Sequence, residues 1–290
     1  MSMLVTGASG NLGRLVAARL LETHAPHEVV LATRTPAALA DFAARGVDVR
    51  EADFSRPSTL TAAFAGVERM LLISTDAIGA REAQHAAAID AARDAGVSFV
   101  AYTSFPTPAV PSSPLAAEHV ATEAALRASG MAWSILRNFP YAEGQIPEYE
   151  RAVAGGELVS NTGGGRTAFV ARADCADAAA AVLGTAGHDG TTYDLTGPEA
   201  LADSDLAALF SELGGTHVAL RRVDDAEFAE SLSAASGMPL PMALGLAASV
   251  GDLTRSGLYA PVSADVELLT GRPATPLASA LEAAIRNRRG

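Results

Sequence analysis

The first 140 residues alternate between two hydrophobic periods, and this alternation restricts the possible folds more than any other feature. Short β-branched and apolar runs indicate buried strands at 3–6, 28–32, 47–50, 69–73, 99–103 and 132–136. Stretches with helical spacing separate them, at 12–23, 36–44, 58–65, 80–95 and 116–129. Strands that alternate with helices over short turns form βαβ units, so the sequence predicts an α/β fold with a doubly wound parallel sheet of the Rossmann type. Gly46, Gly66, Gly96 and Gly130 follow four of these helices, where a left-handed terminal residue suits glycine.

The pattern becomes less regular after Asn138. The sequence predicts a Rossmann domain over 1–138 and a smaller α/β C-terminal lobe over 139–290, with some later segments returning to the first domain. An irregular segment is expected at 139–146 and a turn at 161–166, whose sequence is NTGGGR. Strands are expected near 168–170, 192–195 and 218–223, with helices from 174 and over 204–213.

A glycine-rich loop follows the first predicted strand directly and opens the first predicted helix. Its residues are Thr6, Gly7, Ala8, Ser9, Gly10, Asn11, Leu12 and Gly13. Gly7 permits a tight turn, Gly10 lets the backbone approach a diphosphate, and Gly13 lets the helix pack closely on the sheet. Backbone amides and the helix dipole then face the doubly charged diphosphate. This strand, loop and helix in succession predict a dinucleotide site rather than a simple turn.

The end of the second predicted strand indicates which dinucleotide binds. A site for NAD usually places Asp or Glu there for the ribose 2′-hydroxyl, whereas this chain has Arg34 and no acid. A guanidinium can pair with a 2′-phosphate, so NADP(H) is the expected cofactor, although an ordinary surface arginine is the alternative. Asp53, after the third strand, is expected near the adenine or its ribose. It could equally be a residue at a helix N-terminus, as could Ser55.

Composition excludes several classes of protein. The formal net charge is −12 and the 21 basic residues form no long run, so neither nucleic acid nor an anionic membrane is an expected partner.

A single cysteine, Cys175, allows no intramolecular disulfide. No signal peptide is visible, and the longest apolar stretch, 239–250, is shorter than the roughly 20 residues of a spanning helix. A cytoplasmic protein is therefore expected. The scattered histidines share no ligand spacing, so no metal site is predicted.

Taken together, short strings along the whole chain resemble a known family. VTGASGNLG, LATRTPA, GVDVREADF, MLLIST, AAIDAARDAGV, FVAYTS, LRNFPYAE and TGRPATPL are similar to NmrA-like atypical short-chain reductases, among them most to the type 2 NAD(P)H:quinone oxidoreductases. The resemblance runs from Met3 to about Ile285. It implies a Rossmann domain, NADPH, a small lobe, a substrate cleft between the lobes, and a monomer or homodimer. It also places further coenzyme contacts at Ser74, Thr75, Thr103 and Phe139.

The chain departs from the wider superfamily in one respect that bears on chemistry. Alcohol and ketone dehydrogenases of that superfamily use a Tyr-x-x-x-Lys pair, and alignment on Glu123 and Gly130 puts Leu115 and His119 at those positions. Ser104 matches the superfamily's serine. Strongly electrophilic acceptors need chiefly orientation over the nicotinamide, so the loss fits reduction of quinones or dyes.

Four residues are the candidate catalytic groups: Ser104, His119, Asn138 and Tyr141. Tyr141 lies where this family lines its substrate cleft, and its alternative is a half-buried tyrosine without chemistry. His119 could hold the ribose or simply face solvent, and Asn138 could bond the backbone of its turn. The expected function is NADPH-dependent reduction of quinones or related electron-poor aromatics. The alternatives are a non-catalytic NADP(H)-sensing regulator and a reductase of another substrate, such as a triarylmethane dye.

Overall fold

The computed structural model describes residues 1–106 and 114–289, which form two compact units. The large unit contains Met1–Asn138, Ala173–Leu195 and Asp265–Arg272. The small unit contains Phe139–Arg172, Thr196–Ala264 and Pro273–Gly290. Each unit therefore draws on several separate parts of the chain, and residues after 172 return to the large unit twice.

A parallel sheet of seven strands forms the centre of the large unit, in the order β3-β2-β1-β4-β5-β6-β9. The strands are β1 (Met3–Val5), β2 (Val29–Thr33), β3 (Asp48–Glu51), β4 (Arg69–Leu72), β5 (Phe99–Ser104), β6 (Ala132–Asn138) and β9 (Thr191–Leu195). Leu4 pairs with Val30 on one side and Met70 on the other, so the strand order reverses direction between β1 and β4. Because β1, β2 and β5 are buried along their whole length, they need helices on both faces. The predicted Rossmann-type sheet is confirmed.

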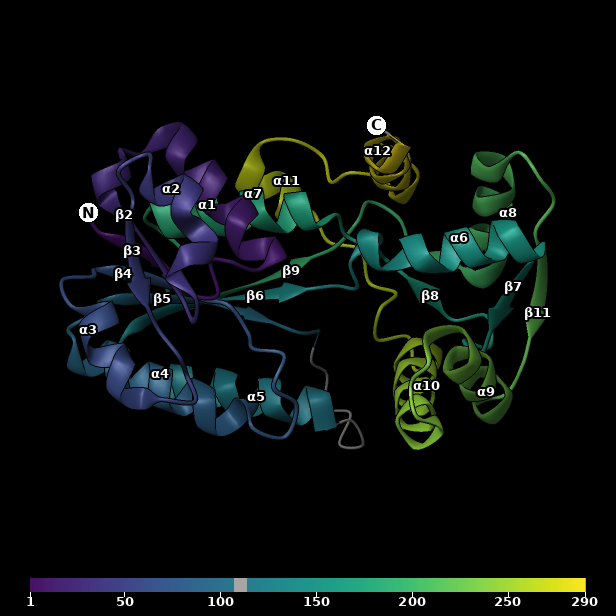
Figure 1. Cartoon of the computed structure of the whole chain (residues 1–290), viewed down its shortest axis with the longest axis horizontal. Helices are drawn as coiled ribbons and strands as arrows, with labels where there is room; N and C mark the ends of the chain where they lie inside the picture. Colours follow the sequence, from purple (N-terminus) through teal and green to yellow (C-terminus); the bar gives the residue numbers. More distant parts are fainter. Residues whose placement is uncertain (107–113, 290) are drawn as a thin grey trace. The chain divides into compact units, whose positions relative to one another are not determined.

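Helices cover both faces of this sheet. Figure 1 shows α1 and α7 on one face and α3, α4 and α5 on the other. Their bounds are α1 (Asn11–Thr23), α3 (Leu60–Phe64), α4 (Arg81–Asp94), α5 (Pro114–Ala128) and α7 (Arg172–Gly184), with α2 (Ala40–Ala43) and α11 (Asp265–Thr270) being shorter. Short 3-10 turns occur at η1 (Pro26–Glu28), η2 (Pro36–Leu39) and η3 (Pro57–Thr59). One face of the sheet packs Phe64, Met70, Val100, Tyr102 and Leu126 into a continuous apolar cluster.

The helices predicted at 36–44 and 58–65 are shorter than expected. Each of these segments begins with a 3-10 turn at a proline, and only the second part of the segment is α-helical. The four glycines predicted to end helices, Gly46, Gly66, Gly96 and Gly130, all have positive φ, between 72° and 85°. Glycine tolerates that region without the steric cost that a Cβ would add.

The small unit is built from helices around two short sheets. β7 (Glu157–Ser160) pairs in parallel with β11 (Ala219–Arg222), and β8 (Arg166–Thr167) pairs antiparallel with β10 (Leu201–Ala202). The helical segments are η4 (Ala142–Gln145), α6 (Ile146–Gly155), α8 (Asp203–Gly214), α9 (Asp225–Ser236), α10 (Leu240–Arg255) and α12 (Leu277–Arg289). Tyr149, Phe169, Phe210 and Leu277 pack together in its main apolar core.

Two expectations for the middle of the chain were wrong. The segment 139–146 is not irregular throughout, because η4 begins at Ala142 and α6 at Ile146, with a proline in the first helical turn. Proline is tolerated there because the first helical amides have no partner within the helix. The strand expected near 168–170 is instead β8 at Arg166–Thr167, while Val170 makes an isolated bridge to Tyr141.

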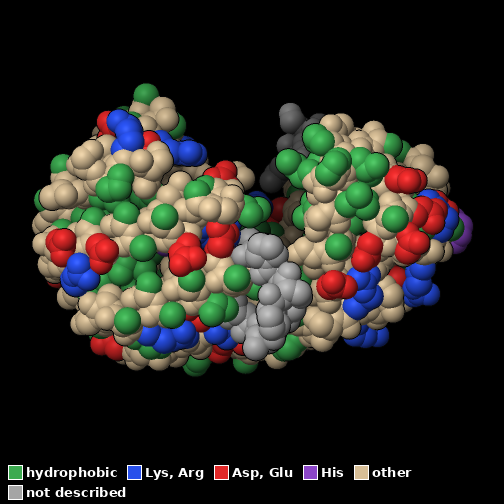
Figure 2. All heavy atoms as spheres, turned by 90° about the horizontal axis from the view of Figure 1, so that it is seen from below, with side chains coloured by type: hydrophobic (Ala, Val, Ile, Leu, Met, Phe, Trp, Pro, Cys, Tyr) green, Lys and Arg blue, Asp and Glu red, His purple; other side chains and the backbone are tan. Residues whose placement is uncertain are grey.

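The surface carries charges of both signs. Figure 2 shows arginine and acidic side chains interspersed on the face that it presents. In the described part of the chain, no helix is long and apolar enough to cross a membrane. Among these residues no group of three or more His, Cys, Asp or Glu is placed to hold a metal ion. Cys175 is buried in α7.

Candidate coenzyme site

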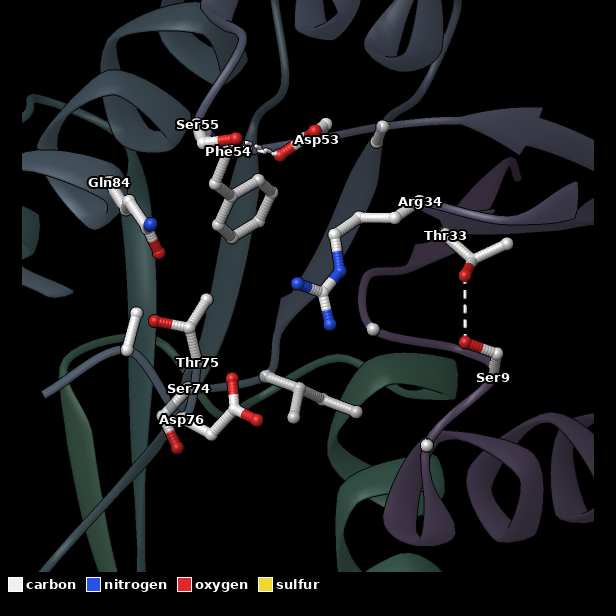
Figure 3. A pocket seen from close by; sticks show the side chains of 15 residues that line it. Ser9, Thr33, Arg34, Asp53, Phe54, Ser55, Ser74, Thr75, Asp76 and Gln84 are labelled. Atoms are coloured by element: carbon white, nitrogen blue, oxygen red, sulfur yellow. Dashed lines mark hydrogen bonds between the residues drawn. The ribbon is translucent and has the colours of Figure 1, made fainter. Parts of the chain in front are cut away.

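A cavity of about 290 Å³ lies at the carboxyl ends of β1, β2, β3 and β4, in the large unit. Figure 3 shows the side chains that line it. Its lining residues are Gly7, Ser9, Gly10, Thr33, Arg34, Ala52, Asp53, Phe54, Ser55, Ile73, Ser74, Thr75, Asp76, Ala77 and Gln84. Because the strand order reverses between β1 and β4, this is the place where parallel α/β sheets leave an open crevice for a ligand.

The glycine loop forms one wall of this cavity. Gly7 has φ +58°, and the Gly10 amide donates to the Gly7 carbonyl at 3.0 Å, which closes a tight turn. A Cβ on Gly13 would lie 2.5 Å from the Gly7 oxygen and 2.7 Å from Ala8 Cα, so only glycine lets α1 pack this closely on the loop. Within α1, the first amide that bonds back to the loop is that of Arg14, which donates to the Gly10 carbonyl. The amides of residues 11–13 therefore precede the helical ladder, as an anion site requires.

Two hydroxyls fix the loop to the neighbouring strands. Thr6 is fully buried, and its hydroxyl donates to the Leu71 carbonyl and accepts from the Ile73 amide, both at 3.0 Å. Ser9 and Thr33 share a hydrogen bond of 2.7 Å (Figure 3). Thr6 thus joins β1 to the end of β4, and Ser9 joins the loop to β2. Thr6, Asn11, Leu12 and Gly13 do not line the cavity, and their predicted contacts with the coenzyme stay predictions.

Arg34 extends into the cavity from the end of β2 (Figure 3). Its side chain is exposed, and among the described residues it has no carboxylate partner. Most other described arginines are in ion pairs, so this guanidinium is available for an anion from outside the chain. Such a position suits a phosphate, because a planar guanidinium can donate two hydrogen bonds to it.

Asp53 lines the cavity but its carboxylate already has partners. It accepts from the Ser55 hydroxyl at 2.6 Å, the Ser55 amide at 2.9 Å and Arg56 Nε at 3.0 Å. These bonds, the Ser55 hydroxyl first and then the Arg56 guanidinium, lower the pKa of Asp53 to about 2. Asp53 therefore shapes the turn before η3, and it presents a permanent negative charge at the edge of the cavity.

The wall after β4 is held by a buried set of side chains from α4 and α5. The Thr75 amide donates to His85 Nε2 at 3.1 Å, and the Thr75 carbonyl accepts from Arg81 Nε at 2.8 Å. His85 Nδ1 bonds Thr122 at 3.0 Å, and Arg81 pairs with Glu118 at 2.9 Å. Since Nε2 accepts a hydrogen bond from the Thr75 amide, His85 is neutral with its hydrogen on Nδ1. Burial, together with Arg81 and His119, lowers the pKa of His85 to about 3.

Two further observations support the binding of a dinucleotide in this cavity. The hydroxyl oxygen of Thr75 is buried and has no hydrogen-bond partner among the described residues. Ser74 has its amide bound to the Thr103 hydroxyl at 2.9 Å, which fixes the wall from β5. Thr103 is buried behind the cavity and does not line it. Residues that sequence reasoning did not assign to the coenzyme also line the cavity: Thr33, Phe54, Ser55, Asp76 and Gln84.

The candidate catalytic residues of the large unit lie in a buried polar region. Ser104 donates to Glu123 at 2.7 Å, and Glu123 also pairs with Arg137 at 2.9 Å and Arg127 at 3.0 Å. Burial alone would raise the pKa of Glu123, but the hydrogen bonds from Arg137, Ser104 and Arg127 lower it below its ordinary value. The Ser104 proton is therefore held by a carboxylate. Asn138 is buried at the end of β6.

His119 is buried on α5, so the alternative of a solvent-facing histidine was wrong. It is 4% exposed, its Nδ1 lies 2.7 Å from the Tyr102 hydroxyl, and its ring stacks on Phe105 at 5.7 Å. Burial lowers the pKa of His119 to about 3. At neutral pH it is uncharged and does not reproduce the cation of the superfamily's lysine. Leu115 lies outside the residues whose side chains are described.

Phe139 and Tyr141 begin the small unit. Phe139 is 3% exposed, whereas Tyr141 is partly exposed and its ring lies under the Arg172 guanidinium, 4.8 Å from Cζ to the ring centroid. The Ala142 amide donates to Val170 at 2.9 Å, and Glu143 accepts from the Arg172 amide at 3.1 Å. This segment is therefore tied to residues 170–172. Its predicted contacts with coenzyme and acceptor stay predictions.

The fold and this cavity define a Rossmann-type dinucleotide-binding protein. A family model described as NAD(P)H-binding matches residues 7–186. The chain is 38% identical to quinone oxidoreductase 2 of Escherichia coli over 96% of each chain, and 30% identical to the NAD(P)H azoreductase of Xenophilus azovorans over 95% of each. This chain thus belongs to the NAD(P)H-binding, NmrA-like family of oxidoreductases, as its sequence strings indicate.

Solved structures agree with this assignment. An Escherichia coli NADPH-dependent quinone oxidoreductase in complex with NADPH superposes with a TM-score of 0.91 at 37% identity, covering 98% of this chain and 99% of that one. The triphenylmethane reductase of a Citrobacter species, complexed with NADP(H), gives 0.90 at 34% identity and covers 98% of this chain and all of the other.

Arg34→Ala should weaken NADPH binding by about 1.5–3 kcal/mol, the range of a hydrogen bond to a charged group. NADH lacks the 2′-phosphate, so its affinity should hardly change. Titration of both coenzymes into both proteins measures the difference. Arg93→Ala, which removes an exposed arginine of α4 outside the cavity, is the matched control. Equal losses for NADPH and NADH would contradict the assignment of Arg34 to the phosphate.

Proposed function

We propose that this protein is an NADPH-dependent reductase that transfers hydride to quinones or related electron-poor aromatic acceptors. One observation carries the proposal: a coenzyme cavity with an unpaired arginine at the 2′-phosphate position belongs to a chain that matches a quinone oxidoreductase over almost its whole length. The coenzyme supplies the hydride when it is bound. The chain's own residues bind it and fix the walls of its cavity.

The buried polar region argues against alcohol and ketone chemistry. The sequence contains no lysine, so no lysine can supply the cation of a Tyr-x-x-x-Lys pair. His119, at that position, is buried and uncharged, and Ser104 already donates to Glu123. The site therefore suits poorly an acceptor whose reduction requires a strong proton donor. Quinones need it less, because orientation supplies most of the rate and a general acid adds a smaller factor.

Tyr141 is the proposed aromatic residue of the acceptor site. The Arg172 guanidinium lies over its ring and holds the ring in place. Tyr141→Phe should lower turnover or acceptor affinity by a modest factor, and Tyr141→Ala should lower it further because the aromatic surface is lost as well. NADPH affinity should be nearly unchanged in both variants. Steady-state kinetics with the best quinone measure this, and wild-type kinetics in both variants would exclude Tyr141 from the site.

The experiment that tests the function is NADPH oxidation against a panel of benzoquinones, naphthoquinones, azo dyes and triarylmethane dyes. Dye reduction is the second candidate, because the Citrobacter and Xenophilus relatives are named as a triphenylmethane reductase and an azoreductase. A quinone as best acceptor supports the proposal, and a dye as best acceptor supports the second candidate. If the protein binds NADPH yet reduces none of them, a coenzyme-sensing role takes the place of both.

A further inference from the structure

Two polar side chains of the coenzyme cavity face the same space and form no hydrogen bond with the described part of the chain. They are the Gln84 carboxamide, which is half-buried, and the Thr75 hydroxyl, whose oxygen is buried. Figure 3 shows both groups on the far side of Arg34 from Ser9, with the Gln84 carboxamide directed towards Thr75. A buried hydroxyl without a partner destabilises a protein, so its presence here indicates a ligand that completes the bond.

The backbone fixes both side chains without using their polar groups. The Thr75 amide is bonded to His85 and its carbonyl to Arg81, so the direction in which its side chain leaves the wall is set. Gln84 precedes His85 on α4, and its backbone N–H donates to the Ala80 carbonyl at 3.1 Å. The carboxamide and the hydroxyl are therefore held in place and remain available to a molecule from outside the chain.

The walls around these two groups are apolar. Ala52, Phe54, Ile73 and Ala77 line the same cavity. The Phe54 and His85 rings are nearly perpendicular, at 86°, with their centroids 6.4 Å apart, so the histidine does not stack on the phenylalanine. An aromatic side chain offers a surface on which a nucleic acid base can stack. Apolar walls with two neutral polar groups therefore suit a flat, uncharged heterocycle with a polar edge.

Arg34 indicates which half of the dinucleotide occupies this cavity. The 2′-phosphate belongs to the adenosine half, and Arg34 lines the same cavity as Gln84. Sites for small organic ligands have volumes of roughly 300–1,000 Å³. The cavity, with about 290 Å³, is at the lower end of that range, which suits one nucleoside better than a whole dinucleotide. The flat heterocycle is therefore the adenine base.

We propose that Gln84 recognises the adenine base of the coenzyme, with Thr75 as a second contact. A glutamine carboxamide forms two hydrogen bonds with adenine, because its oxygen accepts from the exocyclic amine and its N–H donates to a neighbouring ring nitrogen. The Thr75 hydroxyl can accept from or donate to the same edge of the base. Gln84 thus determines specificity for the base, as Arg34 does for the 2′-phosphate. This role concerns coenzyme binding and is independent of the acceptor.

The oxidised coenzyme with an ethenoadenine base, etheno-NADP⁺, tests this pairing, because the added ring removes the hydrogens of the exocyclic amine. The wild type should bind etheno-NADP⁺ about 5- to 50-fold more weakly than NADP⁺, the effect of two neutral hydrogen bonds. Gln84→Leu should bind NADP⁺ more weakly by a similar factor, and it should bind etheno-NADP⁺ as the wild type does. The preference for the unmodified base is then lost. Isothermal titration of both coenzymes into both proteins measures it.

Further variants separate recognition of the base from effects on structure. Gln145→Leu makes the same change at the only other glutamine of the chain, in the small unit, and should bind both coenzymes as the wild type does. Thr75→Val should weaken NADP⁺ binding about 2- to 10-fold, and Thr75→Ser, which keeps the hydroxyl, should restore it. Gln84→Leu should weaken NADP⁺ and NAD⁺ equally, whereas Arg34→Ala affects NADP⁺ alone.

Two results would overturn the role of Gln84. Unchanged NADP⁺ affinity in Gln84→Leu would mean that the carboxamide does not touch the base. A preference for NADP⁺ over etheno-NADP⁺ that persists in this variant would mean that the added ring is rejected by its size alone. Gln84→Met keeps the length of the side chain without its polar atoms, and it replaces the leucine variant in the same titrations if that variant does not fold.

Discussion

Replacing Gly10 with valine should reduce NADPH binding by about 3–6 kcal/mol, or two to four orders of magnitude in the dissociation constant, while the protein stays folded. A branched side chain at the start of α1 occupies the space where a diphosphate would meet the helix amides, so at least two charged hydrogen bonds are lost. Gly10 has φ −75°, a conformation that valine adopts readily. Isothermal titration with NADPH, beside thermal unfolding, measures both consequences.

Two further glycine variants separate binding from stability. A Cβ at residue 10 would lie 3.2 Å from the Gly7 carbonyl, which needs only a small adjustment, so Gly10→Ala should fold normally and bind NADPH with intermediate affinity. A Cβ at residue 13 would overlap the backbone of Gly7 and Ala8, and Gly13→Ala should lose about 1–3 kcal/mol of stability. Wild-type NADPH affinity in the valine variant would mean that the loop is an ordinary turn.

The coenzyme loop and Arg34 could be predicted from sequence because both depend on local order along the chain. A loop that directly follows a buried strand must lie at the carboxyl edge of a parallel sheet, and the end of the next strand must lie beside it. The contact between Ser9 and Thr33 is the direct result of that arrangement. Neither position requires knowledge of how the helices pack.

Other parts of the site depend on packing that no sequence period encodes. No motif distinguishes His85 or Gln84 in the sequence, yet His85 holds the cavity wall through Thr75 and Gln84 lines the cavity. Which face of α4 meets the loop after β4 is decided by helices that contact each other across the sheet. The strands of the small unit were harder still to predict from sequence. β8 and β10 have two residues each, and a strand of that length shows no alternation of apolar and polar residues.

The largest effect expected from pH is a loss of stability on acidification, caused by His85 and His119. Burial lowers the pKa of both to about 3, against 6.5 for an unburied histidine. Between these values the unfolded chain binds protons that the folded chain does not, so the free energy of unfolding falls as pH falls. Arg81 opposes protonation of both rings, while Glu123 favours it only at His119. At pH 7 little of the stabilisation has been lost.

From pH 7 to pH 5 the loss should be about 2 kcal/mol for each histidine, about 4 kcal/mol in all. That is a large part of the roughly 5–15 kcal/mol that stabilises an ordinary domain. Because pH 5 still lies above both folded pKa values, the unfolded chain sets the size of this loss. Urea denaturation at pH 7, 6 and 5 measures it. His85→Gln keeps an acceptor for the Thr75 amide and a donor for Thr122, and removes the titrating ring.

His85→Gln should therefore lose about half as much stability between pH 7 and pH 5 as the wild type does. The exposed His217→Gln is the matched control and should follow the wild type. The carboxylates with lowered pKa, Asp53 and Glu123, act in the same direction but only at lower pH, where they begin to take up protons. If His85→Gln and the wild type lose the same stability over this range, His85 is protonated in the folded protein, and it cannot accept the Thr75 amide that fixes the wall of the coenzyme cavity.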